Sequence, residues 1–237
     1  MKRTKSVFIH GFNNDNSGWE ELLSYWEPFK TLPKILAEKR GEKVTYDSGA
    51  AFPTEIMSWK SGSFDFSLQR LWDAYKDQGK ILEYFDIWDK ANSDAIELGK
   101  SIAQNVNKFY TSGEKVVLSA HSLGSVAALE AAKNIRPDIN IYIFILAGSA
   151  PACDFNRTID AHENIKLVTN IYSTEDVELQ ILFRKNDSFH PVGLTAISSA
   201  RNIETNFKSK LSHSDYKSNS QVKSIFRDFT KSVAEHC

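Results

Sequence analysis

The feature that most constrains this 237-residue chain is a serine placed between an apolar run and an alanine-rich segment. Residues 116–118 are Val-Val-Leu, and this short β-branched run predicts a buried strand. Residues 125–132 are rich in alanine and leucine, which predicts a helix. Ser122 lies between them in the sequence Ala-His-Ser-Leu-Gly, so it is expected on a sharp strand-to-helix turn that exposes its hydroxyl as a nucleophile.

The turn departs at one position from the usual Gly-x-Ser-x-Gly pattern, because Ala120 stands where the first glycine would be. Small residues are needed beside such a turn, since the helix backbone passes close to the strand, and alanine meets that need nearly as well as glycine. A simpler interpretation is that Ser122 only caps the helix. We favour a nucleophile because the strand, turn and helix patterns agree.

A glycine turn also follows the first apolar run of the chain. Residues 6–9 are expected to form the first strand, and Gly11 lets the backbone turn sharply after it. The N–H of Phe12 then points at a developing negative charge, and the N–H of Leu123 supplies a second donor. An ordinary glycine and asparagine turn is the alternative. Two histidines flank these donors and are expected to pack and hydrogen-bond near the site: His10 and His121.

A serine nucleophile needs a base, and the base needs an acid that orients it. At a strand–turn–helix site of this kind, the order along the chain is serine, acid, histidine. That order restricts the base to three histidines: His190, His213 and His236. We expect His213 to be the base, because it lies between the last predicted strand and the last predicted helix.

The acid has two candidates, each of which follows a predicted strand. Asp154 comes after residues 139–146, and Asp176 comes after residues 165–172. We favour Asp176 because its turn is tighter, although the same side chain could simply cap a helix at Val177–Phe183. Both positions belong to the carboxyl edge of a parallel sheet, where functional sites gather.

Strands and helices alternate along the whole chain, which predicts an α/β fold with a mostly parallel sheet and helices on both faces. A single domain, residues 1–237, is expected. Strands are predicted at residues 6–9, 42–47, 54–59, 116–118, 139–146, 165–172 and within 195–204, and amphipathic helices at 92–110 and 220–236.

An aromatic segment, residues 60–92, precedes the helix that leads to the serine strand. It is expected to form a small cap or lid containing two short helices, with Trp72 and Trp88 lining an apolar acyl pocket. Ordinary core packing of these rings is the alternative.

Composition excludes several functions. The net charge of −1 gives no general affinity for nucleic acid or anionic lipid. No phosphate-binding glycine motif and no zinc-ligand spacing occurs, so no cofactor and no metal are expected. Two cysteines make no disulfide framework, and no apolar run has the length of a signal peptide or a membrane span. The expected location is the cytoplasm, with export by a dedicated secretion system left open, and the oligomeric state is not constrained.

Six short segments together resemble the motifs of a family of small bacterial α/β-hydrolases of poorly defined function. They are residues 7–14 (its HGYNN start), 58–62 (SWPS-G, with Lys60 in place of proline), 84–93 (Y-D-A-S), 121–125 (HSMGS), 172–179 (YS-D-L) and 213–216 (HSYF). The resemblance implies the α/β-hydrolase fold and a triad of Ser122, Asp176 and His213. The resemblance says little about the substrate. We predict hydrolysis of a small-molecule or lipid carboxylic ester; the alternatives are an acyltransferase, a thioesterase or an inactive binding module of this fold.

Overall fold

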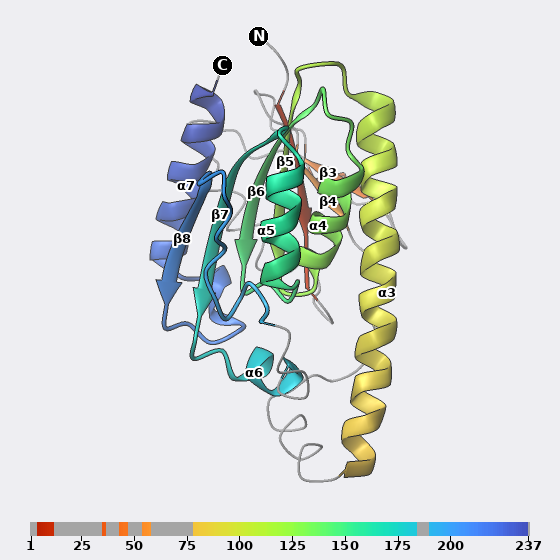
Figure 1. Cartoon of the computed structure of the whole chain (residues 1–237), viewed down its shortest axis with the longest axis vertical. Helices are drawn as coiled ribbons and strands as arrows, with labels where there is room; N and C mark the ends of the chain where they lie inside the picture. The colour runs from red at the N-terminus through yellow and green to blue at the C-terminus, as the bar shows by residue number, and fades with distance from the viewer. Residues whose placement is uncertain are drawn as a thin grey trace.

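The computed structural model describes residues 4–11, 35–36, 43–46, 54–57, 78–183 and 190–236. These residues form an eight-stranded sheet with helices on both faces (Figure 1). The strands are β1 Thr4–Ile9, β2 Ile35–Leu36, β3 Lys43–Tyr46, β4 Thr54–Met57, β5 Lys115–His121, β6 Asn140–Leu146, β7 Ile165–Ser173 and β8 Glu204–Ser209. The helices are α3 Gln78–Phe109, α4 Gly124–Asn134, α5 Ala152–Ala161, α6 Val177–Phe183, the 3₁₀ turn η1 Asp215–Lys217 and α7 Ser220–Glu235.

The strand order is β2-β3-β4-β1-β5-β6-β7-β8. All neighbours from β4 to β8 pair in parallel, whereas β2 and β3 are antiparallel additions at one edge. The register places His121 opposite Leu146, and Leu146 opposite Ile171. The carboxyl ends of β5, β6 and β7 therefore meet at one edge of the sheet, and the predicted parallel α/β architecture is confirmed.

Strand β6 shows how the sheet is buried on both faces. Its three isoleucines, Ile141, Ile143 and Ile145, pack in one hydrophobic cluster with residues of α3, α4 and α5. Its alternate residues, including Phe144, pack in a second cluster against α7. Figure 1 shows the same arrangement, with α3, α4 and α5 on one side of the sheet and α7 on the other. Burial on both faces explains why β6 is apolar almost throughout rather than alternating.

Helix α3 begins at Gln78, so the predicted start at residue 92 is wrong. The buried residues Trp88, Ala91 and Ala95 form one continuous helical stripe across that position. The aromatic character of the segment concealed the helical spacing. The described part of the predicted cap, residues 78–92, is thus the first half of α3, which extends past the carboxyl edge of the sheet (Figure 1). Residues 60–77, including Trp72, lie outside the described residues.

The last strand was also predicted too early, because β8 begins at Glu204, where the predicted range 195–204 ends. The side chain of Asn206 on β8 binds both the N–H and the carbonyl of Ile197, each at 2.8 Å. The main chain at Ile197 is therefore bonded to β8 through the side chain of Asn206 and not through strand pairing. Helix α5, which carries Asp154, was not predicted.

Candidate active site

Ser122 follows β5 directly and adopts a left-handed backbone conformation, with φ of 51°. A non-glycine residue in this conformation costs free energy, and it persists only where its surroundings hold it. Here the Ser122 N–H donates to the carbonyl of Leu146 at 3.0 Å, and its carbonyl accepts from the N–H groups of Ser125 and Ser149. The sharp turn predicted between strand and helix is present, and it directs a side chain that is only 4% exposed.

Two glycines allow the close packing around this turn. A Cβ on Gly124 would lie 2.3 Å from the carbonyl oxygen of Ile9, because the start of α4 passes against the end of β1. A Cβ on Gly11 would lie 2.7 Å from the Cβ of Ser122. Larger residues at these two positions would therefore displace the turn.

Asp176 lies in the turn between β7 and α6 and is fully buried. Its Oδ1 accepts from the N–H of Leu179 at 3.0 Å, so it caps α6. Its Oδ2 accepts a hydrogen bond from Nδ1 of His213 at 2.8 Å. One carboxylate thus caps the helix with one oxygen and bonds the histidine with the other, so the two alternatives that the sequence offered are compatible.

His213 lies between β8 and η1, and its side chain is 18% exposed. Because a carboxylate only accepts, Nδ1 carries the proton toward Asp176. In a neutral ring Nε2 is then an acceptor, and it lies 2.8 Å from Oγ of Ser122. The three predicted residues therefore form one hydrogen-bonded chain, in which the histidine is aligned to take a proton from the serine hydroxyl.

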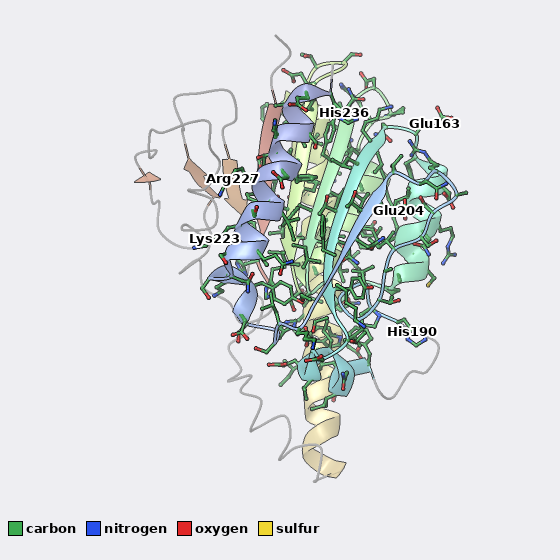
Figure 2. All side chains as sticks on the ribbon, turned by 90° about the vertical axis from the view of Figure 1, so that its left-hand side faces the viewer. Glu163, His190, Glu204, Lys223, Arg227 and His236 are labelled. Carbon is green, nitrogen blue, oxygen red and sulfur yellow. The ribbon has the colours of Figure 1, made fainter. Side chains whose placement is uncertain are left out.

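The competing residues occupy other positions. Asp154 lies on α5 and pairs with Arg157 at 2.6 Å. Figure 2 shows His236 at the upper end of α7 and His190 at the right-hand side of the lower half, and Nδ1 of His236 bonds the carbonyl of Ser232 in α7. In the described part of the chain, no hydrogen bond joins any of these three residues to Ser122.

Of the predicted oxyanion donors, Leu123 is the N-cap of α4 and is fully buried, and Phe12 lies outside the described residues. The ring of His10, before the predicted turn, bonds the carbonyl of Gly11 through Nδ1 at 2.8 Å. Trp88 is 8% exposed, belongs to the core cluster of α3, α4 and α5, and meets the ring of Phe183 edge-on at 6.1 Å. Its role in a pocket stays a prediction.

Sequence reasoning missed two polar residues of the site. Ser125 Oγ donates to the carbonyl of Ser122 at 2.6 Å and accepts from the N–H of Ala150 at 3.0 Å. Glu178 follows Asp176 in the first turn of α6, and its Oε2 is buried without a hydrogen-bond partner. Burial raises the pKa of Glu178 above its ordinary value. Ser125 is itself a small residue next to Gly124 at a tight turn, and this was a usable signal. Nothing in the sequence distinguishes Glu178 from a surface glutamate.

Within the described residues, no group of three or more His, Cys, Asp or Glu side chains has the arrangement of a metal site. Across the same ranges, none of the helices combines the length and the apolar character that crossing a bilayer requires.

Comparison with known proteins identifies the fold. No protein-family model and no curated protein sequence matches the chain. The solved structures that match include an uncharacterized protein from Bacillus cereus, with a TM-score of 0.56 and 13% identity over 99% of this chain; the chain spans 61% of that protein's length. A Listeria innocua gene product matches with a TM-score of 0.54 and 8% identity, covering 99% of this chain and 95% of its own.

A third structure, acyl-protein thioesterase 2 from Zea mays, matches with a TM-score of 0.50 and 12% identity. The alignment covers 98% of this chain and 94% of the thioesterase. At such low identity the likeness concerns the fold and not the substrate. Together with the parallel sheet and its helices, it shows that the chain has the α/β-hydrolase fold.

Proposed function

We propose that the chain is a serine hydrolase that cleaves a carboxylic ester through an acyl-enzyme. The single observation that carries this proposal is the hydrogen-bonded chain from Ser122 to His213 to Asp176, with both links at 2.8 Å. A buried serine held at a positive φ and hydrogen-bonded to a histidine is arranged for nucleophilic attack. A binding module does not require this combination.

In the first half of the reaction, Oγ of Ser122 attacks the ester carbonyl carbon while its proton passes to Nε2 of His213. The new oxyanion accepts hydrogen bonds from the N–H groups of Leu123 and Phe12. The N–H of Leu123 belongs to the first residues of α4, which have no partner within the helix and lie at the positive end of its dipole. The carbon–oxygen bond to the alcohol then breaks, and Nε2 returns the proton to the leaving oxygen.

In the second half, a water molecule replaces the alcohol. His213 removes a proton from this water, the resulting hydroxide attacks the acyl carbon, and the bond to Oγ breaks as the serine regains its proton. Asp176 stays ionised throughout and stabilises the imidazolium that forms twice in each cycle. The product is a carboxylic acid, and the enzyme returns to its starting state.

Turnover of a panel of p-nitrophenyl esters, a thioester and a phospholipid tests this proposal. We expect ester hydrolysis by the wild type and a loss on the order of 10⁴-fold in Ser122→Ala, with the fold retained. A preference for the thioester would move the assignment to a thioesterase, and transfer to an added alcohol would move it to an acyltransferase. Absence of turnover on every substrate would contradict the proposal.

Asparagine substitutions at the two candidate acids form a matched pair. Asp176→Asn keeps the helix cap through its amide oxygen but removes the charge that stabilises the imidazolium. We expect a loss of kcat on the order of 10⁴-fold in Asp176→Asn and less than about twofold in Asp154→Asn. The reverse pattern would place the acid after β6 and contradict the assignment.

A further inference from the structure

The residue before the nucleophile, His121, makes a long-range contact with the loop that carries the base. It is the last residue of β5 and is 2% exposed. Its Nε2 lies 3.0 Å from the main-chain carbonyl oxygen of His213. Because a carbonyl only accepts, Nε2 of His121 carries a proton and donates it to this bond.

The imidazole of His121 is neutral at neutral pH. Burial is the main reason that its pKa is lowered well below the ordinary value of 6.5. The positive charges that His213, Lys217 and His10 carry when protonated lower it further. The donor to the loop is therefore an uncharged N–H, which adds no fixed positive charge beside the base.

The two histidine rings are also in contact. The centroid of the His121 ring lies 5.0 Å from that of His213, with the planes inclined by 45°. The fully buried ring of Tyr216 also lies beside the His121 ring, and the two centroids are 6.3 Å apart. The buried residue His121 thus contacts His213 twice, through a hydrogen bond to its main chain and through its imidazole ring.

The other contacts of the loop do not reach β5 through its main chain: Leu211 packs against the core cluster that contains Tyr216, and its N–H donates to Oγ of Ser209. Asp215 bonds Ser212 within the loop through both its main chain and its side chain. Among the hydrogen bonds between described residues, the bond from His121 is the one that ties the main chain of residues 210–214 to β5. The position of this loop determines whether His213 reaches Ser122.

We propose that His121 is a positioning residue, which acts through His213 and holds its imidazole between Ser122 and Asp176 without touching the substrate. This inference rests on the proposed function of the triad. A shift of the base by about 1 Å is enough to cost on the order of 100-fold in rate, because proton transfer depends on alignment. The loss should fall on kcat, since the substrate does not contact His121.

Glutamine and asparagine at position 121 form the decisive pair of variants. The amide nitrogen of glutamine reaches the place of Nε2, whereas that of asparagine stops one methylene short of it. We expect His121→Asn to lower kcat about 10- to 100-fold with KM changed less than about twofold, and His121→Gln to recover kcat to within about threefold of wild type. His236→Asn, the same substitution at an exposed histidine, should leave both constants unchanged.

Proton NMR supplies a measurement that needs no substrate. The Nδ1–H of His213, held by Asp176, should give a strongly downfield resonance in the wild type and in His121→Gln, and a broadened or absent one in His121→Asn. If wild type has this resonance but turns over no ester, the proposed function fails while the positioning role is still measured. An unchanged resonance in His121→Asn, or equal loss of kcat in both variants together with an equal fall in Tm, would overturn the inference.

Discussion

At the scale of single residues, the site depends on a strained serine whose backbone is held from three sides. The N–H of Ser122 is bonded by β6, and its carbonyl is bonded by Ser125 of α4 and by Ser149 after β6. Such strain persists only where the surrounding structure determines it. The side chain of Ser125 joins two of these sides, because its Oγ bonds both the Ser122 carbonyl and the N–H of Ala150.

Removing that hydroxyl should therefore loosen the turn. We expect Ser125→Ala to lower the free energy of unfolding by about 1–3 kcal/mol, because the buried N–H of Ala150 loses its acceptor. Urea denaturation measures this change. Ser93→Ala is the control, since Ser93 makes one exposed bond to Asp89 on α3 and its loss should cost less than about 0.5 kcal/mol. Equal effects at the two positions would contradict a specific role for Ser125.

The buried His121 also predicts a dependence of stability on pH. Its pKa is lowered in the folded state, so below about pH 6.5 the unfolded chain binds the proton more readily than the folded chain does. The stability contributed by this group is present above pH 6.5 and is lost as the pH falls, by up to about 1.4 kcal/mol per pH unit. Denaturation of wild type and His121→Gln between pH 5 and 8 measures the difference, and parallel curves for the two proteins would contradict it.

At the scale of elements, α3 and α6 join the core to the carboxyl edge of the sheet. Trp88 of α3 meets Phe183 of α6, and α6 begins at the residue after Asp176. The ring that Trp88 meets thus belongs to α6, the helix that Asp176 caps. Both stability and substrate preference are consequently expected to depend on the Trp88 ring.

Trp88→Ala should lower the free energy of unfolding by about 3–5 kcal/mol, because it empties a core position. Turnover of p-nitrophenyl esters of increasing acyl length, measured on the same variant, tests the predicted pocket. Each methylene buried there contributes roughly 0.8 kcal/mol, so losing the ring should reduce the preference for longer chains. A flat profile together with the fall in stability would leave Trp88 as a core residue only. Trp88→Phe is the conservative control.

At the scale of the whole molecule, the parallel sheet was predictable because β5 and β6 are buried on both faces and contain apolar runs that do not alternate with polar residues. The meeting of Ser122, Asp176 and His213 was predictable because parallel strands end at one edge and each residue follows such a strand. Their order along the chain came from the nucleophile pattern itself.

Other features depended on tertiary contacts that no local pattern records. Strand β8 is half-exposed and polar, and Asn206 satisfies the segment before it through a side chain. The start of α3 was predicted too late, because the many aromatic residues before residue 92 concealed the helical spacing of its buried residues. The bond from His121 to His213 joins residues 92 positions apart, so no spacing in the sequence could predict it.

The most direct test of the account is labelling with a fluorophosphonate probe, followed by intact mass and peptide mapping. The probe reacts with a serine hydroxyl only where a base activates it. We predict one adduct on the wild-type chain, located on Ser122, and none on Ser122→Ala under the same conditions. An unlabelled wild-type protein with its native fold, or an adduct that persists in Ser122→Ala on another serine, would contradict the assignment of Ser122 as the nucleophile.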